Sequence, residues 1–179
     1  DDKLLGDAKN IVVVGGGVVG CETAYWLSYE KGRQVTVVEM LPYFMHGSCT
    51  ANRGHLIHYM QANGVKLLNC AKVVGFEPGK VLINRNVSAG VPNPYNTWQP
   101  ILPENIENPL AKKIGPQTKD ETLEADLIIL AMGGKPDDAP FYAAQSERVA
   151  PELYNIGDSF AAGRVLEASR AAYNLAARI

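Results

Sequence analysis

Residues 11–22 read Ile-Val-Val-Val-Gly-Gly-Gly-Val-Val-Gly-Cys-Glu, an apolar strand that runs into a glycine turn and opens a helix. The spacing Gly15-x-Gly17-x-x-Gly20 fits a dinucleotide pyrophosphate. Gly15 permits the tight turn, Gly17 lets the backbone approach the phosphates, and Gly20 lets the helix lie close to the strand. The helix N-terminus offers N–H groups and partial positive charge to the anion. Candidate cofactor contacts here are Gly15, Gly16, Gly17, Val18, Val19 and Gly20.

The segments around this turn complete a βαβ unit. The sequence predicts a strand at 10–14, a helix at 21–30 ended by Lys31 and Gly32, and a second strand at 34–39. Glu39 ends that strand, where a carboxylate can accept hydrogen bonds from ribose hydroxyls. The residues after it, Met40 and Leu41, supply no arginine for a 2′-phosphate, so we expect NAD(H) rather than NADP. The alternative for Glu39 is a solvated carboxylate at a strand end.

The rest of the chain shows further α/β patterning. The sequence predicts a helix from Cys49 or Thr50 to Asn63 capped by Ser48 or Thr50, strands at 65–69, 71–77, 81–84, 122–126, 127–131 and 153–158, and a helix at 165–177. Residues from about 86 to 121 form a proline-rich insertion, which we expect to be irregular and anchored by Trp98 and Ile101. The pattern therefore indicates a parallel sheet with helices and a small antiparallel β-meander.

Composition narrows the class of protein. The chain has 179 residues and a net charge of −2, which gives no electrostatic reason to expect nucleic acid or an anionic membrane. It contains no apolar run of the roughly 18 residues that a membrane helix needs. Its three cysteines have no C-x-x-C spacing, so we expect reduced thiols and a cytoplasmic protein. The start at Asp1, with neither Met nor a signal pattern, suggests a processed or excised piece, and oligomerisation stays open.

Four ordered motifs resemble one group of flavoproteins. They are residues 12–24 around the glycine turn, Val-Thr-Val-Val-Glu at 35–39, Ala-Met-Gly-Gly-Lys-Pro at 131–136 and Tyr-Asn-Ile-Gly-Asp at 154–158. Together they resemble the C-terminal part of reductases with two dinucleotide domains. The sequences of these motifs are most similar to those of NADH:flavin oxidoreductases of the old-yellow-enzyme-related group. This group includes 2,4-dienoyl-CoA reductase, 2-enoate reductase and trimethylamine dehydrogenase. The resemblance implies a three-layer, Rossmann-like FAD/NAD(P)-binding α/β fold.

The resemblance also implies roles for residues outside the glycine turn. Glu22 matches an acidic residue near the nicotinamide, although a contact with the helix dipole explains it equally well. Ala131, Met132 and Gly133 match the segment that passes the dinucleotide, the alternative being a close-packed strand end. Gly157 and Asp158 match the segment that binds the ribityl or phosphate side of FAD, although Asp158 could simply cap a helix. Arg164 and Val165 begin a helix that resembles the one facing the flavin N1/C2 edge.

The implied activity is hydride transfer from NADH to a flavin, which the parent enzyme would use to reduce an activated alkene. Residues 1–150 then form the NAD(P)-binding domain and 151–179 the closing segment of an FAD-binding domain. No glycine-rich turn for the FAD diphosphate precedes Ile11, so the isolated chain should bind NAD(H), hold FAD poorly and be inactive. FAD belongs to the full-length parent, and FMN and an iron–sulfur cluster are implied there by resemblance only. The expected partners are dinucleotides and the rest of the parent flavoenzyme.

Two other interpretations stay open. The chain could be a stand-alone NAD-binding sensor or subunit, or a fragment of a ferredoxin-type or disulfide-type reductase. The missing cysteine pair disfavours the disulfide type. No catalytic side chain is assigned, because hydride transfer needs no acid or base from the protein. His46, Cys49, His55 and His58 could present zinc ligands, but a loop-and-helix surface explains them more simply. Cys21 is either a low-pKa thiol at a helix N-terminus or, as we expect, a buried small apolar side chain.

Overall fold

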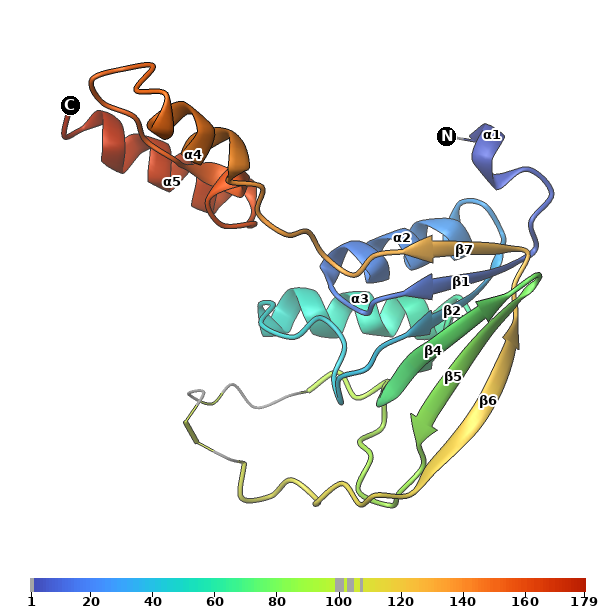
Figure 1. The fold of residues 1–179 in the computed structure, drawn as a ribbon. Helices are drawn as coiled ribbons and strands as arrows, with labels where there is room; N and C mark the ends of the chain where they lie inside the picture. The colour runs from blue at the N-terminus through green and yellow to red at the C-terminus, as the bar shows by residue number, and fades with distance from the viewer. Residues whose placement is uncertain (1, 99–101, 103–104, 107) are drawn as a thin grey trace. The chain divides into compact units, whose positions relative to one another are not determined.

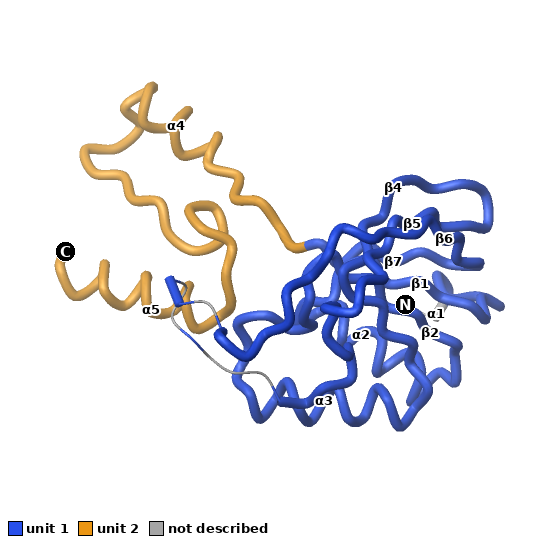
Figure 2. The backbone as a smooth tube through the Cα atoms, turned by 90° about the horizontal axis from the view of Figure 1, so that it is seen from below, with its two compact units in different colours: residues 1–132 blue, residues 133–179 orange. Residues whose placement is uncertain are grey.

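The computed structural model describes residues 2–98, 102, 105–106 and 108–179. The chain divides into two compact units, residues 1–132 and residues 133–179 (Figure 2). The predicted functional division after residue 150 concerns which cofactor each part binds, and it stays a prediction.

A four-stranded parallel sheet forms the centre of the first unit (Figure 1). Val12, Val13 and Val14 are buried, as expected for a β-branched strand covered on both faces. β1 and β2 pair in register from Asn10 with Gln34 to Val14 with Val38. The strands, in the spatial order β3-β2-β1-β7, are β1 (Asn10–Val14), β2 (Gln34–Val38), β3 (Lys66–Leu68) and β7 (Leu127–Leu130).

Two helices, α2 (Val18–Tyr29) and α3 (Thr50–Ala62), cover one face of this sheet (Figure 1). Their buried side chains share one core with alternate residues of the strands, because successive strand residues point to opposite faces. This core includes Leu5 of the short helix α1 (Asp2–Leu5) and also contains Ile11, Val13, Val35, Val37, Cys21, Ala24, Leu27, Ile57 and Met60.

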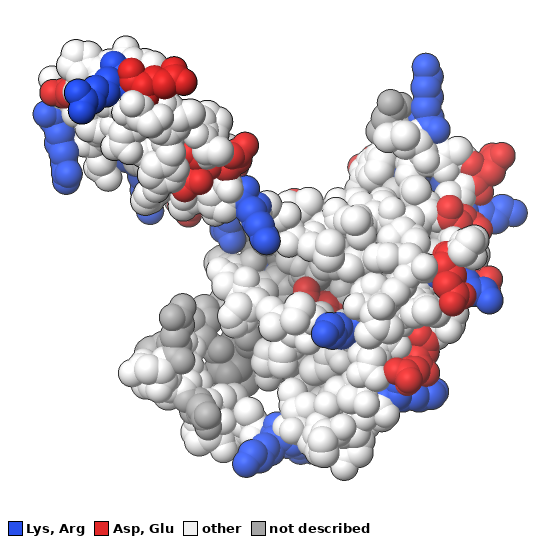
Figure 3. Space-filling model, viewed as in Figure 1, with Lys and Arg blue, Asp and Glu red and all other residues white. Residues whose placement is uncertain are grey.

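An antiparallel sheet covers the opposite face. It consists of β4 (Ala71–Glu77), β5 (Lys80–Asn86) and β6 (Thr118–Glu124), in the order β4-β5-β6. Val81 and Ile83 of β5 pack with Val12 and Val14 in a second core. Basic and acidic side chains alternate over this side of the unit (Figure 3), as with Lys119 Nζ, 3.7 Å from Glu121 Oε1. The predicted three-layer α/β architecture is confirmed.

The second unit contains α4 (Ala139–Ser146), the 3-10 turn η1 (Gly157–Ser159) and α5 (Val165–Ala176). The predicted strand at 153–158 is wrong: this stretch is irregular and ends in η1. A strand needs a neighbouring strand for its hydrogen bonds, and all strands in the described part of the chain pair within the first unit. Helix α4 was not predicted from sequence. Every residue of the second unit remains at least partly exposed.

Several boundaries differ from those predicted. Helix α2 begins at Val18 instead of Cys21, and β6 begins at Thr118 instead of Thr122. Neither Ser48 nor Thr50 caps α3, because its N-cap is Cys49 and no side chain bonds there. No helix in the described ranges is long and apolar enough to span a membrane.

The insertion is irregular between 87 and 117 where it is described, as expected, but residues 118–121 belong to β6 and its anchors differ from those predicted. Trp98 is 66% exposed, and Ile101 lies outside the described residues. Tyr95 makes one of its attachments. Its hydroxyl accepts the Leu67 N–H at 3.1 Å and donates to the Val65 carbonyl at 3.0 Å. Tyr95 thereby satisfies the outer edge of β3, which would otherwise expose unpaired backbone groups.

Candidate functional site

The glycine turn links the end of β1 to the start of α2. Gly15 has φ +109°, a backbone conformation that favours glycine, and its N–H donates to the Val38 carbonyl at 2.9 Å. A Cβ on Gly15 would overlap the Ala131 carbonyl, and a Cβ on Gly20 would overlap the Gly15 carbonyl. Gly15 and Gly20 therefore have the roles in turn formation and close packing that their spacing predicts.

Gly17 differs from its neighbours because its surroundings are open. It is the N-cap of α2 with φ −70°, and a Cβ placed on it meets no other atom within 4 Å. The first N–H groups of a helix have no partners within the helix, so they are free to face an anion. Val18 is half-buried and Val19 is 68% exposed beside this open space. This combination of open space and helix N-terminus suits a pyrophosphate.

Glu39 is bound into the turn by both carboxylate oxygens. Oε2 accepts the Gly16 N–H and Oε1 accepts the Leu41 N–H, each at 2.7 Å. These hydrogen bonds fix Glu39 at the strand end, and its role toward a ribose stays a prediction. Each oxygen retains further acceptor capacity, so Glu39 can still receive ribose hydroxyls. Met40, the next residue, is 67% exposed.

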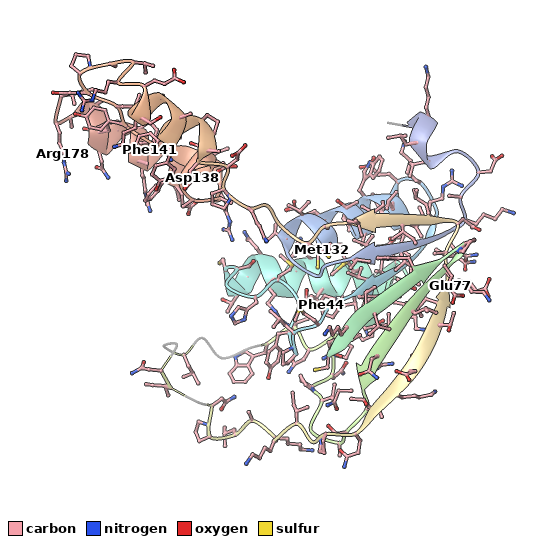
Figure 4. All side chains as sticks on the ribbon, in the orientation of Figure 1. Phe44, Glu77, Met132, Asp138, Phe141 and Arg178 are labelled. Atoms are coloured by element: carbon pink, nitrogen blue, oxygen red, sulfur yellow. The ribbon has the colours of Figure 1, made fainter. Side chains whose placement is uncertain are left out.

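The loop after β2 packs directly against the glycine turn. Phe44 is fully buried, and a Cβ on Gly16 would meet its ring. The Met45 N–H donates to the Gly16 carbonyl at 2.7 Å. Figure 4 labels Phe44 near the end of the sheet where β1 finishes. Sequence reasoning did not find this support, because Phe44 and Gly16 are far apart along the chain.

Three further candidates belong to the first unit: Ala131 and Met132 at the end of β7, and Glu22 in α2. The Ala131 N–H donates to the Val14 carbonyl at 2.8 Å, and Met132 after it is 68% exposed (labelled in Figure 4). Glu22 is exposed, but the expectation that it lies on the first turn of the helix is wrong, because α2 begins at Val18. A helix-dipole contact therefore explains Glu22 less well, since that effect fades beyond the first turn.

The remaining predicted site residues belong to the second unit. Asp158 lies in η1, where its Oδ1 accepts the Gly163 N–H at 3.2 Å. Gly157 has φ +69° and Gly133 has φ +82°. Arg164 is the N-cap of α5, so Asp158 does not cap that helix, and Val165 begins it as predicted. Val165 is 82% exposed.

The Cys21 side chain is fully buried under the turn, with Sγ 3.4 Å from the Gly16 carbonyl oxygen. Burial first, and then the Glu39 carboxylate, raises the pKa of Cys21 from its ordinary value of 9.0 to about 12. This confirms the expectation of a buried small apolar side chain. The low-pKa alternative is wrong.

We expect iodoacetamide at pH 8 to modify Cys49, which is exposed, and to leave Cys21 unmodified in the folded chain. Folding raises the pKa of Cys21 from 9.0 to about 12. The contribution of the protonated, buried thiol to the free energy of unfolding is therefore complete below about pH 9 and is lost as the pH rises toward 12. Peptide mass spectrometry after timed alkylation measures both thiols. Equal rates at Cys21 and Cys49 would contradict the buried assignment, and alkylation in urea provides the control for intrinsic reactivity.

The histidines of α3 form an aromatic surface. The rings of His55 and His58 lie 4.5 and 5.8 Å from that of Tyr59, edge to face. Among the described residues, no group of three or more histidine, cysteine, aspartate or glutamate side chains is placed to hold a metal ion.

Comparison with known proteins identifies relatives of this fold. Residues 1–96 match the family model described as pyridine nucleotide-disulphide oxidoreductase. NADH oxidase of Thermoanaerobacter brockii is 25% identical over 171 residues, 96% of this chain and 21% of that protein. Cinnamate reductase of Clostridium sporogenes is 38% identical over 71 residues, 36% of this chain and 10% of that protein.

Solved structures agree on the fold. A 2-naphthoyl-CoA reductase complex aligns with a TM-score of 0.70 and 24% identity over 96% of this chain and 21% of its own. Histamine dehydrogenase from Rhizobium sp. 4-9 aligns with a TM-score of 0.68 and 16% identity over 96% and 22%.

The chain thus spans about a fifth of the length of the relatives that it matches over nearly all its residues. The family model and these similar proteins confirm the resemblance to flavin-dependent oxidoreductases that the four motifs indicated. The family implies the use of FAD and NAD(P)H. The family model matches more than half of the residues, and the chain belongs to the pyridine nucleotide-disulphide oxidoreductase family.

Proposed function

We propose that the chain is the NAD(H)-binding part of a flavin-dependent oxidoreductase. The observation that carries this proposal is the open space at Gly17, the N-cap of α2, next in sequence to Gly16, whose N–H is held by the Glu39 carboxylate. A pyrophosphate would lie against Gly17 and the helix N-terminus, and the adenosine ribose would bond to Glu39.

The proposed cofactor contacts fall into two groups. The pyridine nucleotide would be held by Gly15, Gly16, Gly17, Val18, Val19, Gly20, Glu22, Glu39, Met40, Ala131, Met132 and Gly133. Residues proposed to contact FAD are Gly157, Asp158, Arg164 and Val165, in the segment 151–179 that would close an FAD-binding domain. The segment 1–150 would form the NAD(P)-binding domain.

When both dinucleotides are bound, they supply hydride transfer from the nicotinamide to the flavin. The residues of this chain bind and orient, and they exclude the wrong nucleotide: Glu39 repels a 2′-phosphate, and the glycine turn fixes the pyrophosphate. One similar protein is named cinnamate reductase, and cinnamate carries an alkene conjugated to a carboxylate, which supports reduction of an activated alkene by the whole enzyme. FMN and an iron–sulfur cluster remain suggestions from the resemblance.

Replacing Glu39 with alanine should weaken NADH binding by about 1–3 kcal/mol, because the ribose loses a charged acceptor. Calorimetric titration of the wild-type and variant chains with NADH and NADPH measures the effect. Glu77→Ala is the matched control, because Glu77 is an exposed carboxylate of β4 in the antiparallel sheet. Wild-type affinity for NADPH equal to that for NADH, or an unchanged affinity in Glu39→Ala, would count against the role of Glu39.

A further inference from the structure

Two polar side chains are buried beside the loop that follows β2, and the proposed function does not use them. Arg53 of α3 is 3% exposed and Asn69, after β3, is fully buried. Burying a polar side chain is costly unless it is hydrogen-bonded. The partners of these two side chains therefore show what their burial achieves.

Arg53 joins the loop to the proline-rich insertion. Its Nε donates to the Phe44 carbonyl at 2.9 Å. Its Nη1 donates to the carbonyls of Asn96 at 3.1 Å and Thr97 at 3.2 Å. A planar guanidinium can serve acceptors on two segments at once, which a single ammonium group does less well.

Asn69 makes a second connection between the same two segments. Its Nδ2 donates to the Pro42 carbonyl at 2.7 Å and to the Pro92 carbonyl at 2.8 Å. Since both partners are carbonyls, only the amide nitrogen can face them, and this fixes the orientation of the side chain. Asn69 Oδ1 is buried and has no hydrogen-bond partner.

The connected loop is the one that supports the glycine turn. Phe44 packs on Gly16, Met45 donates to the Gly16 carbonyl, and Glu39 holds the N–H groups of Gly16 and Leu41. A continuous series of contacts therefore runs from insertion residues 92–97 through Arg53 and Asn69 to the proposed adenosine side of the site.

We propose that Arg53 and Asn69 are positioning residues through which segment 92–97 of the insertion sets the affinity for the adenosine half of NAD(H). This inference rests on the proposed function. Without either donor, carbonyls at Pro42 or Phe44 lose a partner and the loop can leave its place against Gly16. The affinity that is lost is that for the adenosine half of NAD(H), because the loop supports Glu39 and the glycine turn.

Tyr95 provides a control within the same segment. Its hydroxyl attaches the insertion to β3 through Leu67 and Val65, and not to the loop after β2. Tyr95→Phe should therefore lower the melting temperature and leave NADH affinity within twofold of wild type.

The experiment compares Arg53→Met, Arg53→Lys, Asn69→Leu and Tyr95→Phe in the 179-residue chain. Dissociation constants are measured for NADH, ADP-ribose and reduced nicotinamide mononucleotide, together with melting temperatures. Arg53→Met and Asn69→Leu should weaken NADH and ADP-ribose at least tenfold and change the mononucleotide less than twofold. Arg53→Lys should give an intermediate loss, and it supplies the measurement if Arg53→Met does not fold.

The outcomes separate this inference from the proposed function. A wild-type chain that binds neither NADH nor ADP-ribose overturns the proposed function. Wild-type binding with unchanged affinities in the Arg53 and Asn69 variants overturns the positioning role alone. An equal loss in Tyr95→Phe, or an equal loss for the mononucleotide, would also overturn it, because general destabilisation would then explain the effect.

Discussion

Replacing Gly15 with alanine is expected to lower the free energy of unfolding of the first unit by about 2–5 kcal/mol. Two costs combine at this position. Its φ of +109° is strained for a residue with a Cβ, and that Cβ would overlap the Ala131 carbonyl. Because the overlap is with backbone, a side-chain rotation cannot relieve it. Urea unfolding followed by tryptophan fluorescence measures the change, since both tryptophans, Trp26 and Trp98, belong to this unit.

Gly79→Ala is the control that separates strain from overlap. Gly79 has φ +73°, and a Cβ there meets no other atom within 4 Å, so only the backbone cost of about 1–2 kcal/mol applies. Gly15→Ala should therefore be clearly less stable than Gly79→Ala. Equal stability of the two variants would contradict the close approach of β7 to the turn.

Replacing Gly17 with alanine should weaken NADH binding at least tenfold, about 1.4 kcal/mol or more, and change the free energy of unfolding by less than about 1 kcal/mol. Gly17 has φ −70°, which alanine adopts without strain, and its Cβ would project into open space. That space is where the pyrophosphate is proposed to lie. The added methyl group would then hold the phosphates away from the helix N–H groups.

Calorimetry with NADH and urea unfolding of the same samples measure both quantities. The combination matters because Gly15→Ala should lose binding together with stability, whereas Gly17→Ala should lose binding alone. Wild-type affinity in Gly17→Ala would show that the dinucleotide does not approach the turn at this residue.

The fold of the first unit was largely predictable, because its signals are local. The β-branched run of β1, the glycines after it and the strand that ends at Glu39 specify a βαβ unit through short-range geometry. The hairpin at Pro78 and Gly79 is equally local. Helix α2 begins at Val18, earlier than predicted, although valine and glycine at 18–20 have low helix propensity. The close approach of Gly20 to the Gly15 carbonyl is a tertiary contact that local propensity does not reveal.

The second unit was less predictable, because its segments lack strong signals of their own. Residues 153–158 include the apolar side chains of Leu153, Tyr154 and Ile156, but a strand also needs a neighbouring strand, and sequence alone does not supply one. Helix α4 was not predicted from its polar surroundings, and its Pro140 lies in the first turn, where proline is well tolerated.

The candidate site could be predicted from sequence where residue spacing determines its geometry and not where its contacts are long-range, and its cofactor contacts stay predictions. Gly15, Gly20 and Glu39 were identified from their spacing. Other contacts join residues that are distant in sequence: the hydrogen bond of Glu39 with Gly16, the packing of Phe44 on Gly16 and the bridges from Arg53 and Asn69 to the insertion. No local pattern marks such contacts.

The most direct test of the central claim is calorimetric titration of the 179-residue wild-type chain with NADH. We expect saturable binding of one NADH per chain, with weaker binding of NADPH because Glu39 repels the 2′-phosphate. Absence of NADH binding by a folded chain would contradict the assignment of the glycine turn as a nicotinamide dinucleotide site.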